Sequence, residues 1–473
     1  MDVSATEIRE KVSPFLDGES APSYGLRQQV LSPLEVLAQS ISTMAPSTTP
    51  TLTIPLVFAL AGNGTWLAYL IAMAGMLLMS LCISIFARDS ASPGSLYTYT
   101  RDTLPPIFAA IAAWALFFAY IMTASSVIGG FLNSSYLFLG RLGPHVPGAL
   151  LAVVAAGGAF AIAYRDVKVS AQIMLWIEAT SVCLIALVVA LVLWKHGLHL
   201  DRAQLQLQGT TASGIRLGVM LAIFSFVGFE SATTLGSEAR EPLRNIPRAV
   251  IRSAALAGVF FIVCTYGETL GFHSSPTGLG ESNAPMRFLS AQGGLPIAGP
   301  IIDAGVLVSM FAATLACIIA AARVLMLMAH HGLAHASLSR THSRNETPAA
   351  ASLLAAVLAL LPVAWLAGRG VSGADIYGWM GALAVFGFLT AYALVAVAVP
   401  IHLRRHGRPR WWGVALSVVA TVAMLAAILG TIYPIPPAPY RYLPLIYAVY
   451  LLLGVAWYTV LKRRRPVPSP SLR

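Results

Sequence analysis

The sequence predicts an all-α polytopic membrane protein with twelve transmembrane helices, and three observations support this fold class. Hydrophobic residues make up 57% of the 473-residue chain and charged residues only 10%, with a mean hydropathy of +0.75. Soluble domains carry about a quarter charged residues, so most of this chain must face lipid or other helices. The apolar residues form runs of about 20 or more, the length that crosses a bilayer. The first and sixth runs are each interrupted in the middle by helix-breaking residues.

The twelve runs are spread over nearly the whole chain. We expect spans at residues 31–61, 64–87, 106–138, 146–164, 167–194, 214–236, 249–272, 296–329, 348–367, 375–400, 411–433 and 441–461. The first, third and eighth runs exceed one simple crossing, which indicates a break, a tilt or an extension beyond the bilayer. The flanking polar residues predict tails over 1–30 and 463–473 around a membrane domain over 31–462.

The basic residues predict which way the helices point. With twelve spans both termini lie on one side of the membrane. If that side is the cytosol, 23 of the 30 lysines and arginines are cytosolic and seven lie outside, namely Arg141, Lys195, Arg202, Arg216, Arg287, Arg369 and Arg441. Cytosolic loops are enriched in Lys and Arg. We therefore expect a multi-pass protein of the plasma membrane, most simply a bacterial inner membrane, with cytosolic N- and C-termini.

Composition also argues against several other classes of protein. The net charge of +11 is carried by residues at the ends of the apolar runs, which indicates membrane orientation and not nucleic-acid binding. All four cysteines lie inside apolar runs, as small core residues do, and they suggest neither disulfides nor a metal site. The histidines within 330–342 are too loosely spaced to predict a metal. No catalytic motif falls within a span, so we expect no cofactor and no enzyme activity.

The first and sixth spans contain residues that interrupt a membrane helix. Pro46 and Pro50 each remove a backbone donor and clash with the carbonyl one turn earlier. In the sixth span Gly228 and Glu230 lie within residues 225–231, and a carboxylate at bilayer depth is costly unless it serves a function. Prolines often only kink membrane helices. Two breaks at matching positions favour a binding site instead.

These positions predict an internal repeat. The interrupted spans are the first members of two five-helix halves, so we expect an inverted repeat of residues 31–194 and 214–400, followed by two extra helices over 411–461. A half-helix that begins after a break presents N–H groups to an anion, and one that ends there presents carbonyl groups to a cation. A zwitterionic amino acid satisfies both.

Several stretches resemble the amino acid–polyamine–organocation (APC) superfamily of permeases. The clearest is residues 226–231 (FVGFES), followed by 236–242 (GSEAREP) and 246–249 (IPRA). The loop at 91–99 (ASPGSLYTY) and residues 321–323 (AAR) are also similar to that family. The resemblance implies the LeuT-type five-plus-five fold with two extra helices, and alternating access to an amino acid or amine.

The resemblance also implies which residues bind the substrate. Transferred by position, they form one set at each break: Ser42, Thr43, Met44, Ala45 and Ser47 at the first, and Phe224, Ser225, Phe226, Val227 and Gly228 at the second. Phe224 and Phe226 lie where family members have aromatic gating residues, and ordinary packing between helices is the alternative for each. The first break contains no glycine, unlike that of many members, which puts inferences about substrate identity from those members in doubt.

Two glutamates are candidates for coupling transport to protons. Glu230 begins a half-helix, and its alternative role is a hydrogen-bonding hub between the sixth and seventh spans. Glu178 in the fifth span is the second candidate. A cation site for sodium is the competing interpretation, built from hydroxyl groups of the fifth and eighth spans: Thr180, Ser181, Ser309 and Thr314. Hydroxyl groups in membrane helices more often bond to the backbone or a neighbour, so protons or plain exchange are favoured.

The sequence therefore predicts a secondary active transporter of amino acids or closely related amines, with proton symport as the favoured mode. An exchanger or a polyamine permease is the alternative within transport. Dicationic amines need several acidic groups, and we count only Glu230, Glu178 and Asp303 in the spans, which favours amino acids. A non-transporting nutrient sensor is a further alternative, but such proteins often carry a large soluble domain that this chain lacks.

Overall fold

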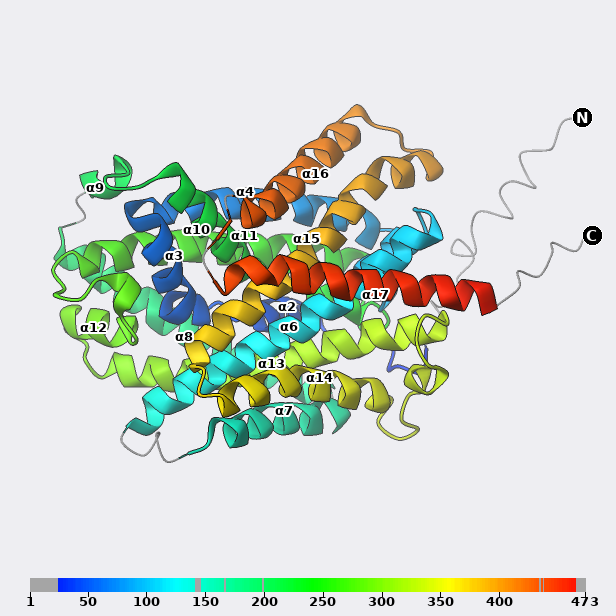
Figure 1. The fold of residues 1–473 in the computed structure, drawn as a ribbon, viewed down its shortest axis with the longest axis horizontal. Helices are drawn as coiled ribbons and strands as arrows, with labels where there is room; N and C mark the ends of the chain where they lie inside the picture. The colour runs from blue at the N-terminus through cyan, green and yellow to red at the C-terminus, as the bar shows by residue number, and fades with distance from the viewer. Residues whose placement is uncertain are drawn as a thin grey trace, which may run out of the picture.

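Helices account for 79% of the described residues. The structure is a computed structural model that describes residues 24–140, 146–165, 167–197, 200–433, 435–436 and 438–464. Most of both predicted tails lies outside these residues. The long helices run roughly along one axis of the molecule (Figure 1). We call the end that carries α9 and α12 the α9 end, and the opposite end, where α17 finishes, the α17 end.

The first half of the chain forms α2 (Pro33–Met44), a π-helical turn (Thr49–Thr53), α3 (Ile54–Ala61), α4 (Thr65–Ala87), α5 (Ser95–Arg101), α6 (Pro106–Leu139), α7 (Gly148–Arg165) and α8 (Val167–Lys195). The second half forms α9 (Arg202–Leu205), α10 (Ala212–Phe226), a 3₁₀ turn (Ser231–Leu235), α11 (Pro242–Phe272), α12 (Pro285–Gln292), α13 (Ala298–His330), α14 (Ala349–Gly368), α15 (Gly373–Arg405), α16 (Trp411–Ile432) and α17 (Leu443–Arg464).

The described residues contain eleven stretches long and apolar enough to cross a membrane, and the first, Pro33–Ala87, is 55 residues long. At about 1.5 Å per helical residue this stretch is far longer than the bilayer core of about 30 Å. It is divided at Gly62, whose positive φ of 52° ends α3 before α4 begins. Counted as two crossings it gives the twelve predicted helices.

The predicted boundaries agree with the helices to within a few residues, with one exception. The seventh span was expected to begin at residue 249, whereas α11 begins at Pro242. Residues 243–248 include Arg244, Asn245 and Arg248, which lower the local hydropathy below that of a membrane span. Proline at the first helical position is pre-organised for a helix, because its fixed φ is helical and its missing N–H would have no partner there.

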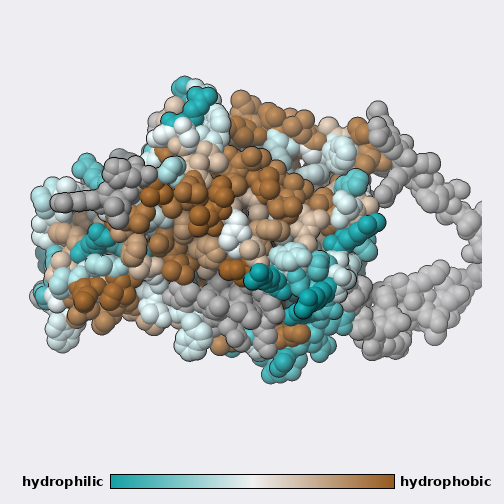
Figure 2. Space-filling view, turned by 90° about the horizontal axis from the view of Figure 1, so that it is seen from below, coloured by the Kyte–Doolittle hydropathy of each residue, from teal (hydrophilic) through white to brown (hydrophobic). Residues whose placement is uncertain are grey.

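The central and peripheral helices differ in burial. The spans of α6, α13 and α15 are mostly buried, whereas α16 and α17 are mostly exposed and lie on the periphery (Figure 1). One face of the molecule carries hydrophobic residues across its middle and hydrophilic residues toward both ends (Figure 2). This is the distribution expected for a protein that crosses a bilayer, and the two peripheral helices correspond to the predicted additions to the repeat.

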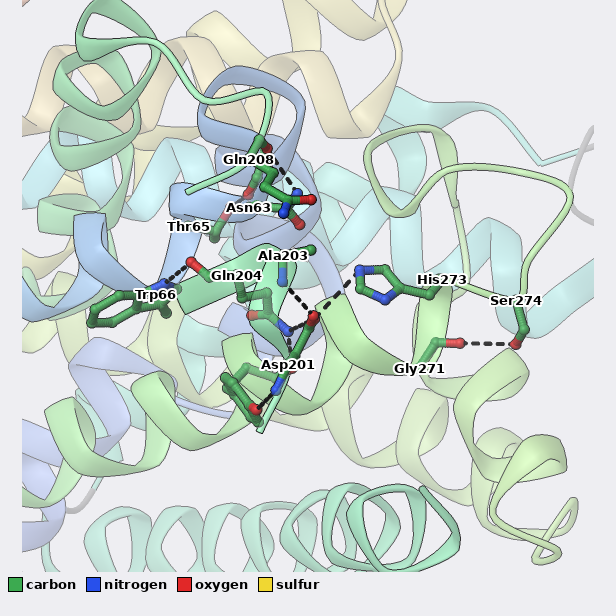
Figure 3. Close-up of polar contacts among 12 residues, drawn as sticks. Asn63, Thr65, Trp66, Asp201, Ala203, Gln204, Gln208, Gly271, His273 and Ser274 are labelled. Atoms are coloured by element: carbon green, nitrogen blue, oxygen red, sulfur yellow. Dashed lines mark hydrogen bonds and ion pairs between the residues drawn. The ribbon is translucent and has the colours of Figure 1, made fainter. Parts of the chain in front are cut away.

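Polar contacts tie the loops together at the α9 end (Figure 3). The Trp66 indole N–H donates to the backbone carbonyl of Gln204 (3.0 Å), and the amide of Gln204 donates to the Asp201 carboxylate (2.8 Å). The Asp201 backbone N–H donates to the Tyr266 hydroxyl (2.7 Å), and its carboxylate lies 3.5 Å from His273 Nε2. These contacts hold the α9 segment against the ends of α4 and α11.

Candidate functional site

The first break follows directly from the sequence of the first span. A capping box starts α2, because Glu35 accepts from the Ser32 backbone N–H (2.7 Å) and Ser32 accepts from the Glu35 N–H in return. The helix ends at Ala45, which has a left-handed backbone with φ of 47°. Pro46 follows and cannot donate to a continuing helix. The chain resumes as the π-helical turn that contains Pro50 and leads into α3.

The second break interrupts the sixth span. α10 ends at Phe226, and residues 227–230 form turns before the 3₁₀ turn begins at Ser231. Gly228 has a φ of 98°, a conformation that residues with a Cβ rarely adopt. The predicted unwinding at this glycine is therefore present in the structure.

The two breaks pack directly against each other. A Cβ added to Gly228 would lie 2.4 Å from Thr43 Cγ2. The Ser231 hydroxyl donates to Thr43 Oγ1 (2.8 Å), and the Ser40 hydroxyl donates to the Phe229 carbonyl (2.7 Å). Side chains near one break thus satisfy backbone and hydroxyl groups of the other, as buried irregular backbone in a membrane requires.

The structure brings most of the predicted substrate residues to this crossing. The five from the first break and the five from the second are all buried: Ser42, Thr43, Met44, Ala45, Ser47, Phe224, Ser225, Phe226, Val227 and Gly228. The Ser225 hydroxyl is 3.0 Å from the Tyr69 hydroxyl. Ser42 Oγ is buried and has no hydrogen-bond partner among the described residues.

The two phenylalanines face different neighbours. The Phe224 ring lies edge-on to Tyr377 of α15, with centroids 5.4 Å apart. Phe226 instead packs against Phe261 of α11, with centroids 5.2 Å apart. Phe224 thus packs against the neighbouring helix α15, and its gating role stays a prediction. The contacts of Phe226 are those of an ordinary core residue.

Glu230 is fully buried and held by two tyrosines from distant helices. Tyr120 of α6 donates to one carboxylate oxygen (2.8 Å), and Tyr392 of α15 donates to the other (2.5 Å). The neighbouring Phe229 carbonyl accepts from Ser253 of α11 (3.2 Å). The carboxylate thus links the sixth span to the third and tenth spans, and not to the seventh as the expected hub would. The role of Glu230 as a proton site stays a prediction.

Glu178 also reaches the first break, although it belongs to α8. Its carboxylate accepts from the Ser47 backbone N–H (2.7 Å) and from the Ser309 hydroxyl of α13. Ser47 begins the segment after the first break, where N–H groups lack helical partners. Glu178 thus accepts the hydrogen bond of the Ser47 N–H, a donor that would otherwise be available to an anionic substrate.

The four hydroxyl groups considered for a cation site do not converge. Thr180 is exposed on α8 and donates to the Trp176 carbonyl of its own helix (2.8 Å). Thr314 likewise donates to the Met310 carbonyl (2.9 Å). Ser181 is buried beside Gly305, and Ser309 is bonded to Glu178. Only the last two lie on the facing sides of α8 and α13.

Sequence reasoning missed four residues near the breaks: Tyr69, Tyr120, Tyr392 and Glu268. Tyrosines inside apolar runs carry no signal of their own, so their contacts could not be found from sequence. Glu268 could have been found, because it is an acidic residue within the span predicted at 249–272. The count of three acidic residues in the spans was therefore wrong, because the predicted spans contain six: Glu35, Glu178, Glu230, Glu268, Asp303 and Asp375.

The chain is closed at the α17 end by backbone pairing and a buried ion pair. Leu31 forms an isolated parallel bridge with Ala239, which joins the start of the first span to the segment after the sixth. Arg323 of α13 donates from two nitrogens to the two carboxylate oxygens of Glu238 (2.7 and 2.8 Å), and both side chains are buried. Such two-point guanidinium–carboxylate pairs are strong and directional.

Near the same end, His331 contacts α5. Its Nδ1 lies 2.9 Å from the Tyr97 hydroxyl, and its Nε2 lies 2.7 Å from an Arg101 nitrogen. Burial and the Arg101 charge lower the pKa of His331 to about 4. The neutral imidazole can accept a hydrogen bond from Arg101, whereas a protonated one would be repelled.

One cluster in the described residues has the composition of a metal site. Ligand atoms of Asp89, His402 and His406 lie within 4.8 Å of one another. His402 Nε2 is 3.0 Å from one Asp89 oxygen, and Arg408 lies 3.4 Å from the other. An ion-pair network explains this arrangement, so the absence of a bound metal stays a prediction.

Comparison with known proteins places this fold and its paired breaks in a family. A family model described as "Amino acid permease" matches residues 35–466. The chain belongs to the amino acid permease family. The permease is 25% identical over 427 residues to the branched-chain amino acid permease BcaP of Bacillus subtilis, covering 85% of this chain and 83% of that one. It is 25% identical over 363 residues to human cationic amino acid transporter 4, covering 71% and 55%.

A solved structure confirms the predicted architecture. The crystal structure of MhsT in complex with L-phenylalanine matches the permease with a TM-score of 0.58 at 16% identity, covering 85% of this chain and 99% of that one. MhsT has the LeuT fold, so the expected fold class is confirmed. The resemblance inferred from residues 226–231 is confirmed by the family model and the related permeases. At this identity the match concerns the fold alone.

Proposed function

We propose that the permease is a secondary active transporter that moves amino acids or closely related amines by alternating access, in symport with protons. One observation supports this most directly: the breaks of the first and sixth spans meet through Gly228, Thr43 and Ser231. Buried backbone without helical partners, together with the unpaired Ser42 hydroxyl, suits a ligand that has both donors and acceptors.

Proton coupling is proposed to act through Glu230. The carboxylate is fully buried, adjoins the second break and is held by tyrosine hydroxyls from α6 and α15. A group that changes charge at this place alters the hydrogen bonds that connect three helices. Glu178 is the second candidate, since its contacts join α8, the first break and α13.

The closed ion pair at the α17 end supports alternating access. Arg323 and Glu238 seal one end around the segment that follows the second break. Opening of this end requires that the pair separate or move together. An exchanger or a non-transporting sensor would bind its ligand at the same site. An exchanger moves a second substrate in the opposite direction instead of a proton in the same direction, and a sensor moves nothing.

The experiment is uptake into liposomes that contain the purified permease. Radiolabelled leucine, lysine and putrescine are offered with and without an inwardly directed proton gradient. We expect one or more to accumulate with the gradient, and Glu230→Gln to abolish this accumulation while the protein still folds. Glu281→Gln, an exposed glutamate at the α9 end, is the matched control and retains uptake.

Other outcomes contradict the proposal in distinct ways. Accumulation driven by sodium and unaffected by the proton gradient would exclude proton symport. Movement of label only when unlabelled amino acid is present on the other side would show an exchanger. Binding of a cargo with no movement of label would indicate a sensor.

A further inference from the structure

Glu268 of α11 is a fully buried carboxylate without a hydrogen-bond partner. Its relative exposure is 0%, and neither oxygen bonds to any part of the chain that the structure describes. The other buried membrane glutamates are paired: Glu230 with two tyrosines, and Glu178 with Ser309 and the Ser47 N–H. Glu238 is likewise paired with Arg323. Glu268 is the exception.

Such a group is strongly unfavourable as an isolated ion. An ionised carboxylate loses its hydration on burial, and only a paired charge and hydrogen bonds can replace that hydration. Acidic residues inside membrane spans accordingly tend to mark pathways for ions or substrates. The position of Glu268 therefore requires a cation beside the carboxylate or a proton on it.

Two neighbouring threonines on α11 also have unpaired hydroxyl groups. Thr265 and Thr269 are buried, and neither hydroxyl has a partner among the described residues. Other threonines in the spans, such as Thr123 and Thr390, donate to the carbonyl four residues earlier (both 2.8 Å). Residues three apart share one face of a helix, so Thr265 lies on the Glu268 side of α11, whereas Thr269 directly follows Glu268 and points about 100° away from it.

This face of α11 continues from the break toward the α9 end. Phe261 lies two turns before Glu268 on the same side of the helix. The Phe261 ring packs against Phe226 (5.2 Å between centroids) and Tyr69 (5.8 Å), and the Tyr69 hydroxyl bonds to Ser225. Beyond Glu268, His273 Nε2 at the end of α11 lies 3.5 Å from the carboxylate of Asp201, which precedes α9 (Figure 3). The unpaired oxygens thus lie between the paired breaks and that end.

The unpaired oxygens suit an ammonium group better than a metal ion. α11 is a continuous helix from Pro242 to Phe272, so most of its backbone carbonyls already accept hydrogen bonds. On the face of Glu268, three side-chain oxygens remain without partners, two from Glu268 and one from Thr265. A primary ammonium has three donors, whereas hard cations such as Mg²⁺ and Ca²⁺ take six or more oxygen ligands.

We propose that Glu268, with Thr265, binds a primary ammonium group of the cargo. The permease then prefers cargo that carries a second positively charged amine, or a lone one without a carboxylate, over a neutral amino acid. The inference rests on the proposed function and specifies its substrate class. Two sources carry this chemistry, an amino acid with a basic side chain and a diamine. Lysine and putrescine represent them.

The test compares leucine, lysine and putrescine on purified permease by thermal shift and by liposome uptake. We expect lysine, putrescine or both to be preferred over leucine. Glu268→Gln removes the charge with little change in shape, and it should weaken the preferred cationic cargo by about 30-fold or more, as loss of one member of a buried charge pair does. Leucine should change little. Glu268→Asp keeps the charge and should retain the preference.

The remaining outcomes separate this inference from the proposed function. If leucine is bound and carried while lysine and putrescine are not, the ammonium site is wrong and the transporter proposal stands. Equal losses for all cargo in Glu268→Gln and Glu268→Asp would show a structural role instead. A sodium requirement that disappears in Glu268→Gln would assign the oxygens to a metal cation. If none of the three compounds binds, both proposals fail.

Discussion

Replacement of Gly228 by alanine tests the close approach of the two breaks. The positive φ of 98° costs a residue with a Cβ about 1–3 kcal/mol. The added Cβ would also lie 2.4 Å from Thr43 Cγ2, and overpacking of this kind costs about 1–3 kcal/mol more. Gly228→Ala should therefore lower the free energy of unfolding by about 2–6 kcal/mol, and uptake should fall because the binding backbone moves.

The matched control is Gly370→Ala. Gly370 also has a positive φ, 79°, but a Cβ there would have nothing within 4 Å. It should show only the backbone cost of about 1–3 kcal/mol, with uptake retained. Adding Thr43→Ser to Gly228→Ala removes the nearest contact, the Cγ2 methyl, and should recover part of the loss. Neighbouring residues couple by about 0.5–3 kcal/mol.

The assay is thermal and denaturant unfolding of the purified variants, together with uptake into liposomes. If Gly228→Ala unfolds like Gly370→Ala and transports at the unaltered rate, the breaks do not approach as closely as the structure shows. If Thr43→Ser gives no recovery in the double variant, the cost does not come from this contact.

Two further predictions concern the α17 end. Arg323→Ala leaves the Glu238 charge buried without a partner and should lower the free energy of unfolding by about 3–5 kcal/mol. Arg244→Ala breaks an exposed ion pair and should lower it by about 1 kcal/mol or less. Equal effects of the two variants would contradict the argument from burial. The pKa of His331 is lowered from 6.5 to about 4 in the folded protein, so stability from its neutral form is present above pH 6.5 and is lost as the pH falls toward 4. His331→Gln should reduce this loss in melting curves recorded between pH 7 and 4, and an unchanged pH profile would contradict it.

The local features of the fold could be predicted because they depend on residues close together in the chain. A run of about 20 apolar residues must cross the bilayer or be buried in the protein, whatever residues surround it in the fold. Pro46 and Gly228 likewise act through their own backbone, since proline lacks a donor and glycine tolerates a positive φ. The number of spans and the position of both breaks followed from this.

The candidate site was predicted only in part. The residues at the breaks were found because the breaks themselves were visible. Thr180 was grouped with Ser309 by residue type, but rotation of α8 directs it outward, and hydroxyl chemistry alone gives no information about helix rotation. Glu268 was overlooked although the rule that selected Glu230 applies equally to it.

The sequence by itself determined that this protein crosses the membrane twelve times and that its first and sixth spans are interrupted. Only the tertiary structure decided which groups meet at the breaks. Glu230 is bonded to tyrosines 110 and 162 residues away, and Glu178 to a backbone N–H 131 residues away. Glu268, in a similar apolar run, meets no partner among the described residues. Hydropathy measures the chemistry of each residue, whereas partners depend on how helices rotate and pack, which no local pattern encodes.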